Sequence, residues 1–297
     1  MAIGVAPVEG PRSRRFHGGW ILEIVFLRGV YQLYTLIRNE WLIGSRDVAF
    51  SHAKQILSIE RTLWLDHERT IQDVFLPYPA LIGLANVYHG PPHLIVTIIC
   101  FVWLYRRAPE RYVRWRNAWI FMLPLALLGF WLYPLMPPAN MPERYGIVDT
   151  KAEFFNVGGA QRIEYGADGE PTEEYLDGHG NPFAGAPSLH IGWAVWAVLA
   201  VWPLATRGWM KVLLIGHWVL TFFAISVTGQ HALLDIGGGV GLWAAGYGLA
   251  VGLDGLAARR RRRGGGWGVG RDGTPKSAAA MEPAAMPSAA PPATSSG

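Results

Sequence analysis

The feature that most constrains this chain is a series of long apolar segments that contain almost no charged residues. A helix needs about 20 predominantly apolar residues to cross the hydrocarbon core of a bilayer. Six segments approach or exceed this length, namely residues 19–37, 77–106, 117–136, 187–206, 210–228 and 232–253. Charged residues make up only 16% of the chain, against about 25% in a typical soluble domain. The sequence therefore predicts an all-α, polytopic membrane protein, a helical bundle of about six transmembrane helices.

Two of these segments differ from a simple span. The second is long for a straight crossing and is interrupted by Pro91-Pro92, so we expect one kinked helix there. The last has glycine at four of the five positions from 237 to 241, and small residues let helices approach closely in lipid. We therefore expect close helix packing around the last span.

Two other segments are not predicted to span the membrane. In residues 45–75, apolar side chains recur at helical intervals with charged residues between them, which predicts an amphipathic helix along the outer membrane surface. Residues 264–297 are rich in Gly, Ala, Pro and Ser and have no periodicity, which predicts a disordered tail. The predicted organisation is a cytoplasmic segment (1–18), a six-span domain (19–256) and a basic, then disordered cytoplasmic tail (257–297).

The positions of lysine and arginine indicate how the chain is oriented, because cytoplasmic segments next to membrane spans are enriched in them. The N-terminal segment, the loops after the second and fourth spans and the arginine run 259–263 after the sixth together hold fifteen basic residues. The opposite side holds eight in much longer loops, and its loop 137–186 is acidic. We therefore expect a multi-pass protein of the cytoplasmic membrane with both termini in the cytoplasm. The five arginines at 259–263 are interpreted as a segment that attracts anionic lipid headgroups, not nucleic acid.

Three short segments carry the residues from which a site can be built. Ionisable residues at membrane level are costly, so each one is a candidate for function. Pro187-Ser188-Leu189-His190 opens the fourth span, the segment 230–235 opens the sixth, and the turn 136–140 follows the third. In the predicted orientation all three lie at the outer face. We therefore expect them to converge into one site that faces outside.

His231 and Asp235 are four residues apart, which puts both side chains on one face of a helix. The carboxylate can accept a proton from one imidazole nitrogen, which fixes the tautomer and leaves the other nitrogen as a nucleophile. His190 supplies a second imidazole as a general acid. Such a set suits phosphoryl transfer without a metal or another cofactor. We therefore expect His231, His190 and Asp235 to be catalytic and to work through a phosphohistidine.

Around these residues the sequence resembles the type 2 phosphatidic acid phosphatase superfamily. The Pro-Ser-Leu-His string is similar to its second signature, and His231 with Asp235 is similar to its third. More closely, the chain resembles the branch that contains inositol phosphorylceramide synthase and bacterial inositolphosphotransferase-like proteins. This similarity includes Tyr31–Tyr34, Arg38, His52–Glu60, Asn86, Tyr88, His93, Trp103–Tyr105 and Pro137-Pro138, and it runs to about Gly239. The resemblance implies His231 as the nucleophile, Asp235 as its partner and His190 as the acid for the leaving group.

The sequence departs from the family pattern where the family has arginines that bind phosphate. Ala224 and Ile225 stand where the third signature usually has Ser-Arg, and Ala139 follows the two prolines where related sequences often have arginine. A phosphoryl group needs cationic or N–H donors to stabilise transition-state charge. The candidate replacements, in order of expectation, are Arg144, Lys151 and Arg38.

Polar residues beside the kink of the second span have two interpretations. Asn86, Tyr88, His89 and His93 either satisfy backbone groups freed by the break or bind the acceptor or the lipid headgroup. The predicted set of substrate- and phosphate-binding residues is Arg144, Ser188, Lys151, Asn86, Tyr88 and His93.

The predicted function is cleavage or transfer of a lipid phosphate ester at the outer face of the membrane. Its partners are the membrane lipid and a hydroxyl acceptor, either water or an alcohol. Two alternatives stay open. His190, His231 and Asp235 also form a plausible three-ligand zinc set, which predicts a metal-dependent membrane hydrolase. The missing arginines also allow a transporter or lipid-handling protein with a degenerate site.

Overall fold

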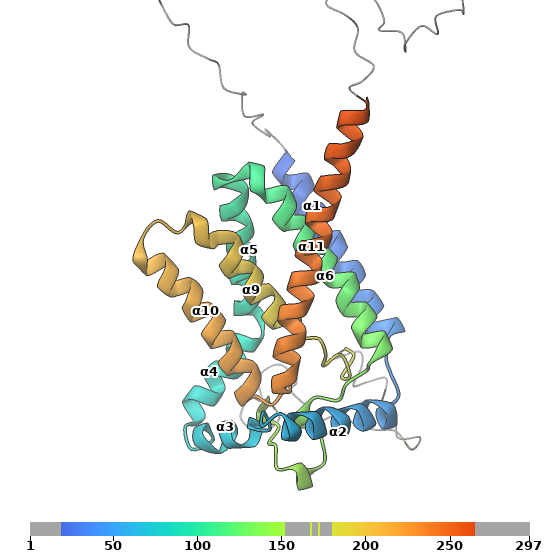
Figure 1. Cartoon of the computed structure of the whole chain (residues 1–297). Coiled ribbons are helices and arrows are strands. Elements are labelled where there is room, and N and C mark those ends of the chain that lie inside the picture. The colour runs from blue at the N-terminus through green and yellow to red at the C-terminus, as the bar shows by residue number, and fades with distance from the viewer. Residues whose placement is uncertain (1–18, 152–166, 168–171, 173–179, 265–297) are drawn as a thin grey trace, which may run out of the picture. The chain divides into compact units, whose positions relative to one another are not determined.

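The computed structural model describes residues 19–151, 167, 172 and 180–264 (Figure 1). The chain divides into two units, residues 1–252 and residues 253–297, and the last helix begins in the first unit and ends in the second. The predicted N-terminal segment 1–18 and the tail beyond Gly264 lie outside the described residues. The described helices are α1 (Gly19–Leu36), the π-helical η1 (Ile37–Trp41), α2 (Arg46–Thr62), α3 (Glu68–Phe75), α4 (Pro79–His89), α5 (Pro91–Arg107), α6 (Pro109–Leu132), η2 (Pro138–Asn140), η3 (Glu143–Tyr145), α9 (Leu189–Val201), η4 (Trp202–Leu204), α10 (Gly208–Val227) and α11 (Leu233–Gly264).

The predicted all-α polytopic membrane architecture is confirmed. Among the described residues, four helices are long and apolar enough to cross a bilayer, namely Gly19–Trp41, Pro109–Leu132, Gly208–Val227 and Leu233–Arg260. The predicted kinked span corresponds to α4 and α5, which are bent by 48° where Pro91 begins the second of them. The predicted fourth span is a shorter apolar helix, Leu189–Leu204. The six expected spans are therefore four full-length helices, one bent pair and one short helix.

The amphipathic segment is two helices, so the prediction of one helix over residues 45–75 is wrong. α2 ends at Thr62 and α3 begins at Glu68, and between them Trp64 takes the left-handed conformation, with φ 58°. Of the apolar side chains that recur at helical intervals, Val48, Ile59 and Leu63 are exposed, as expected for a helix that lies on a membrane surface. The other two, Ile56 and Ile71, are partly buried and pack against the protein. The face of α2 that turns toward the protein instead carries Ala49, Ala53, Leu57 and Glu60.

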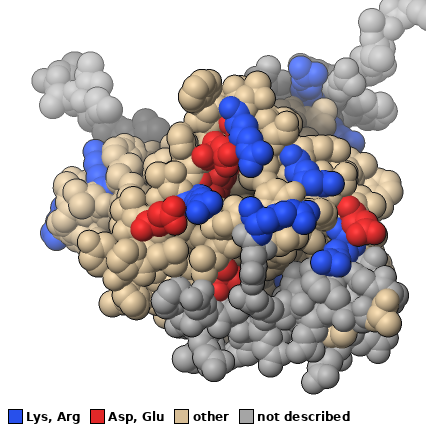
Figure 2. Space-filling view, turned by 90° about the horizontal axis from the view of Figure 1, so that it is seen from below, with Lys and Arg blue, Asp and Glu red and all other residues tan. Residues whose placement is uncertain are grey.

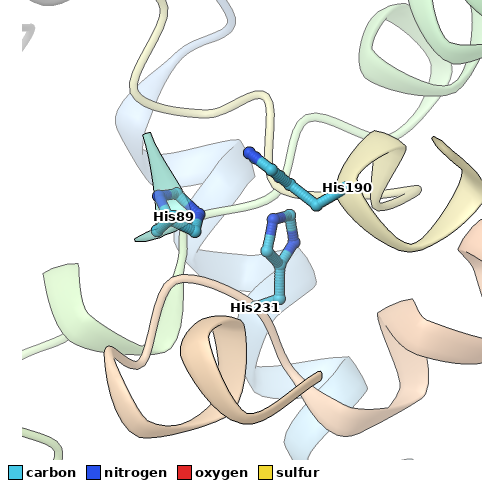
Figure 3. A group of neighbouring side chains, drawn as sticks. All are labelled: His89, His190 and His231. Carbon is cyan, nitrogen blue, oxygen red and sulfur yellow. The ribbon is translucent and has the colours of Figure 1, made fainter. Parts of the chain in front are cut away.

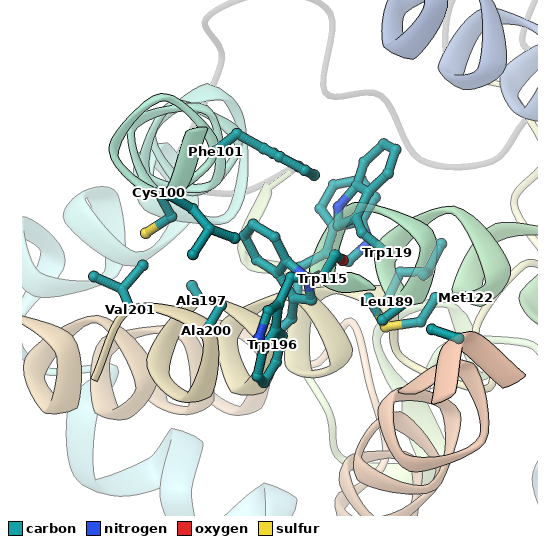
Figure 4. Close-up of a cluster of buried hydrophobic side chains, with 14 of the residues drawn as sticks. Cys100, Phe101, Trp115, Trp119, Met122, Leu189, Trp196, Ala197, Ala200 and Val201 are labelled. Carbon is teal, nitrogen blue, oxygen red and sulfur yellow. Dashed lines mark hydrogen bonds between the residues drawn. The ribbon is translucent and has the colours of Figure 1, made fainter. Parts of the chain in front are cut away.

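Aromatic side chains fill the core between α5, α6 and α9 (Figure 4). The ring of Trp119 lies edge-on to Phe101, with 5.4 Å between ring centroids. Trp196 is fully buried, and its indole N–H donates to the carbonyl of Trp115 at 2.8 Å, so its one polar atom is satisfied. This packing fixes α9, whose first turn carries His190, against α5 and α6.

The close approach of α11 to α9 depends on Gly239. A Cβ atom at this position would lie 2.5 Å from the carbonyl oxygen of Ser188 and 2.8 Å from Cβ of Ile191. Only hydrogen fits there, which agrees with the expectation that the glycine-rich stretch serves helix packing. The beginnings of α9 and α11, which carry the two predicted catalytic histidines, are thereby brought side by side.

Candidate active site

Three histidines from three different segments point toward one another (Figure 3). His89 is the last residue of α4, His190 lies in the first turn of α9, and His231 lies two residues before the start of α11. The ring centroid of His190 lies 4.3 Å from that of His89 and 5.6 Å from that of His231. One nitrogen of each ring lies within 4.8 Å of the others. The structure thus brings the two predicted catalytic histidines together and adds a third.

His231 and Asp235 are in contact but are not hydrogen-bonded. Nδ1 of His231 lies 3.7 Å from Oδ2 of Asp235, and both side chains are buried. That distance is too long for a hydrogen bond and short enough for an ion pair once the imidazole is protonated. The same carboxylate oxygen accepts the backbone N–H of Ala232 at 3.2 Å, so Asp235 also satisfies a donor at the start of its own helix. The spacing of four residues therefore brings the imidazole of His231 close to the carboxylate of Asp235. The backbone N–H of Ala232 competes with the imidazole for the same carboxylate oxygen.

The turn between α10 and α11 sets the position of His231. Gly229 has a φ of 65°, and a Cβ there would lie 2.8 Å from Cγ2 of Ile147, so this turn requires glycine. The carbonyl of Gly229 accepts the N–H of Ala139 at 2.8 Å, which ties this turn to the Pro-Pro turn after α6. All three segments singled out in the sequence therefore meet at one end of the bundle, where α2 and α3 also lie (Figure 1).

Two glutamates from the surface helices hold the first turn of α11. Oε1 of Glu60 accepts the N–H of Leu234 at 2.7 Å, and Oε1 of Glu68 accepts the N–H of Leu233 at 2.8 Å. The first N–H groups of a helix have no partner within the helix, and negative charge near them is stabilised by the helix dipole. Two residues from a distant part of the chain thus cap the N-terminus of α11, the helix that follows His231.

The first turn of α9 is held by two of the predicted substrate-binding residues. Ser188 is its N-cap, and its hydroxyl accepts the N–H of Ile191 at 3.5 Å. Nε2 of His93, on α5, donates to the carbonyl of His190 at 3.0 Å. Tyr88 is hydrogen-bonded through its hydroxyl to Nδ1 of His217, which joins α4 to α10. These contacts are with protein groups, and substrate binding by Ser188, His93 and Tyr88 stays a prediction.

The segment 148–150 is fastened by two amides. Asn86 donates from Nδ2 to the carbonyl of Thr150 at 3.2 Å and accepts the hydroxyl of Thr150 at 3.3 Å. The amide of Gln72 is buried and bonds both to the backbone of Val148 and to the carbonyl of Val227 at the end of α10. Asn86 and Gln72 therefore determine where the next residue, Lys151, lies.

Among the described residues, Lys151 is a basic side chain whose charge reaches two of the three histidines. Its ammonium donates to Oε1 of Gln230 at 3.2 Å, one residue before His231. Its charge interacts with His89 and with His190. Burial lowers the pKa of Lys151 to about 8. At neutral pH the group is therefore still a cation.

Of the two predicted arginines, Arg144 lies away from the three histidines. Arg144 is exposed on η3 with its guanidinium over the ring of Tyr145, 5.3 Å from the ring centroid. It lines a cavity of about 470 Å³ together with Arg61, Arg69 and Glu68, and the three histidines are not among the lining residues. Figure 2 shows the face that carries α2 and α3, where Lys and Arg side chains gather with Asp and Glu between them. Arg38 lies in η1, and its charge interacts with His190.

Sequence reasoning did not include His89, Glu60 or Glu68 in the site. His89 was one of several polar residues beside a proline break, and only the 48° bend between α4 and α5 directs this end of α4 toward His190. The two glutamates follow the charged pattern of an amphipathic helix, which predicts exposure. A helix terminus buried against α2 and α3 reverses that expectation, because it offers N–H donors to the carboxylates.

Comparison with known proteins was consistent with these motifs. A family model described as the PAP2 superfamily matches residues 54–249, well over half of the chain, and the match includes all three histidines and Asp235. No curated protein and no solved structure matched the chain.

Proposed function

The chain belongs to the PAP2 superfamily, the type 2 phosphatidic acid phosphatases, and from this premise we propose that it cleaves or transfers a lipid phosphate ester through a phosphohistidine. Membership makes it a phosphatase-type lipid enzyme. The observation that carries the mechanism is the convergence of His190 with His231, whose Nδ1 faces Asp235 at 3.7 Å.

In the first step Nε2 of His231 attacks phosphorus, since Nδ1 faces Asp235. A P–N bond forms while the P–O bond to the lipid alcohol breaks, and protonated His190 transfers its proton to the departing oxygen. The imidazole of the phosphohistidine carries positive charge, which the carboxylate of Asp235 stabilises. In the second step the acceptor alcohol or water gives its proton to His190 and attacks phosphorus. The P–N bond then breaks and His231 is restored.

The phosphoryl oxygens need a cation, and Lys151 is the proposed source. The support is its hydrogen bond to Gln230 beside His231 and its interaction with His89 and His190. An ammonium held there can stabilise transition-state charge as the family's arginine does elsewhere. His89 supplies a further N–H donor toward the same oxygens. The other proposed substrate-binding residues are Arg144, Ser188, Asn86, Tyr88 and His93.

The acceptor decides between hydrolysis and transfer. The resemblance to inositolphosphotransferase-like proteins favours transfer that involves a lipid phosphodiester or an inositol-type headgroup. The cavity lined by Arg61, Arg69 and Arg144 has the size and polarity for such a headgroup. We assign Arg144 to headgroup contact there and Lys151 to the reacting phosphoryl group.

The proposed location is the cytoplasmic membrane, with both termini in the cytoplasm and the site facing outside. It rests on the fifteen basic residues predicted on one side and the acidic loop 137–186 on the other. Labelling of single introduced cysteines in intact cells tests it, after Cys100 is replaced. Labelling of a cysteine at exposed Asp66 by a membrane-impermeant reagent supports the orientation, and labelling only after lysis contradicts it.

A zinc-dependent hydrolase is the second candidate, and one observation favours it. The nitrogens of His89, His190 and His231 lie within 4.8 Å of one another, in place of the set with Asp235 expected from the sequence. Tetrahedral zinc with Zn–N bonds of about 2.0–2.1 Å requires those nitrogens to approach to about 3.4 Å. Metal analysis of the active protein, with turnover measured after chelation, separates the two. Turnover without metal supports the phosphohistidine, and loss that zinc alone restores supports the hydrolase.

The experiment that tests the proposed function is a substrate panel on the purified protein. Free phosphate and transferred headgroup are both measured for phospholipids and polyprenyl phosphates. Wild type is compared with His231→Ala and with His67→Ala, an exposed histidine outside the site. Turnover that His231→Ala abolishes and His67→Ala keeps supports the proposal. Equal turnover in all three proteins contradicts it.

A further inference from the structure

The pair Glu60 and Glu68 is more buried than a helix cap on the surface requires. Their side chains are exposed by 0% and 1%, although they come from the two helices outside the spans. One oxygen of each carboxyl accepts an N–H of α11, as described above. The other oxygen of each, Oε2, is buried without a hydrogen-bond partner. Burial of a carboxylate oxygen without a hydrogen-bond partner costs free energy. Two such oxygens on neighbouring carboxyl groups therefore indicate a hydrogen bond between the two groups.

One proton placed between the two Oε2 atoms gives both of them a hydrogen-bond partner. The two carboxyl groups are close enough to hydrogen-bond to each other when one of them is protonated. Two buried carboxyl groups in contact do not both ionise readily, because like charges repel and burial disfavours charge. With one proton the pair keeps a single negative charge, which the N-terminus of α11 stabilises. Each carboxyl also keeps an oxygen for its N–H donor.

We infer that Glu60 and Glu68 share one proton and that the singly protonated pair positions the first turn of α11, with His231 before it and Asp235 within it. The two are positioning residues, since they contact the backbone of Leu233 and Leu234 and act on the histidine through it. This role rests on the proposed function of His231, whereas the shared proton does not. The inference deepens the proposed mechanism by explaining what aligns its nucleophile.

The charged surroundings of the pair favour the protonated form. The charged groups around it are Asp235 of α11 and the residues that share the cavity with Glu68, namely Arg61, Asp66, Arg69 and Arg144. Arg61 pairs with Asp66 at 2.9 Å and Arg69 with Asp73 at 3.6 Å, so both guanidinium groups have acidic partners of their own. Burial, with the charges of Glu68 and Asp235 added, raises the pKa of Glu60 to about 8.

The effect of pH on stability follows from this direction. A carboxyl with a higher pKa in the folded than in the unfolded protein binds its proton more tightly when folded. Its contribution to stability is fully present below the unfolded pKa of 4.5, declines as pH rises, and is lost above about 8. Glu60→Gln removes this dependence, because the amide carries no ionisable proton. It keeps an oxygen for Leu234 and offers an N–H to Glu68.

The test compares melting of wild type and Glu60→Gln in detergent from pH 5 to pH 9. We expect the melting temperature of the variant relative to wild type to rise between pH 5 and 8 and to stay constant above 8. Other titrating groups cancel in this difference. Asp47→Asn, an exposed carboxyl on the same helix, is the matched control and should give a difference that does not change with pH. A difference for Glu60→Gln that is also constant overturns the shared proton.

The positioning role is tested by kcat at pH 7, normalised to folded protein. Glu60→Ala should lose about 10- to 100-fold in kcat with little change in KM, because a displaced nucleophile slows chemistry and not binding. Glu60→Gln should recover most of that loss. Equal kcat in wild type and Glu60→Ala overturns positioning. If wild type has no turnover on any substrate, the proposed function and the positioning role that rests on it fail, and the melting comparison still decides whether the proton is shared.

Discussion

The carboxylate of Asp235 lies 3.7 Å from Nδ1 of His231, and the backbone N–H of Ala232 already occupies the carboxylate oxygen on that side. The aspartate therefore has two functions, one toward its own helix and one toward the imidazole. Only the second depends on its negative charge, because a neutral amide oxygen also accepts the N–H of Ala232. The two functions can be separated by a single substitution.

Asp235→Asn should fold normally and lose about 10²- to 10⁴-fold in kcat. The amide oxygen keeps the helix-terminal hydrogen bond, whereas the charge that stabilises the phosphorylated imidazole is gone. Steady-state kinetics together with thermal melting measure both effects. Asp47→Asn on α2 is the control for loss of one carboxylate. Wild-type kcat in Asp235→Asn would show that Asp235 has only a structural role.

His190→Ala should lose activity according to the leaving group. If His190 protonates the departing alcohol, its loss should cost about 10²- to 10⁴-fold on an alkyl phosphate ester. On an aryl ester whose phenol leaves without protonation, the loss should be much smaller. The measurement is kcat on both ester types, with His67→Ala as the control. The same loss on both types would indicate that His190 binds the substrate and does not act as an acid.

Gly239→Ala should destabilise the protein by about 1–3 kcal/mol, the usual cost of overpacking. The added methyl would lie 2.5 Å from the carbonyl oxygen of Ser188, so α9 and α11 have to separate. Gly237→Ala is the matched control on the same helix, because its Cβ meets nothing within 4 Å. Alanine there should be neutral or stabilising by up to about 1 kcal/mol. Equal melting temperatures for the two variants would contradict the close packing of the helices.

Activity should fall at alkaline pH because Lys151 loses its proton. Its pKa is lowered to about 8 by burial, so the cation is present below pH 8 and is lost as pH rises through that value. Between pH 8 and 10.5 the unfolded chain binds the proton more tightly than the folded one, so this group raises the unfolding free energy there as pH rises. Activity lost in that range is therefore not explained by unfolding due to Lys151.

The measurement compares Glu60→Gln with the double variant Glu60→Gln/Lys151→Arg, so that Glu60 does not titrate in either protein. Arginine stays charged throughout this range. We expect kcat to fall about tenfold for each pH unit above 8 in the first protein, as for loss of one proton, and to stay level in the second. Identical pH profiles would remove Lys151 from the proposed site.

A feature of this structure can be predicted from the sequence when the residues that determine it are close together in the chain. Apolar length is a local property, so the spans were predicted, and the His231–Asp235 spacing is local too. His89 depends on the bend between α4 and α5, and Glu60 depends on meeting the N-terminus of a helix more than 170 residues later. No pattern within a single segment of the sequence predicts either of these contacts. The break at Trp64 lies in a stretch with helical periodicity on both sides, so periodicity alone joins α2 to α3.

The central claim is that His231 becomes phosphorylated during turnover. The most direct test is to quench the enzyme with alkali in the course of turnover and to identify phosphorylated peptides by mass spectrometry, because phosphohistidine survives alkali. The predicted result is a phosphoryl group on His231, formed as fast as turnover or faster and absent from His231→Ala. Turnover without any phosphohistidine, or with the phosphoryl group on His89 or His190, would contradict the mechanism.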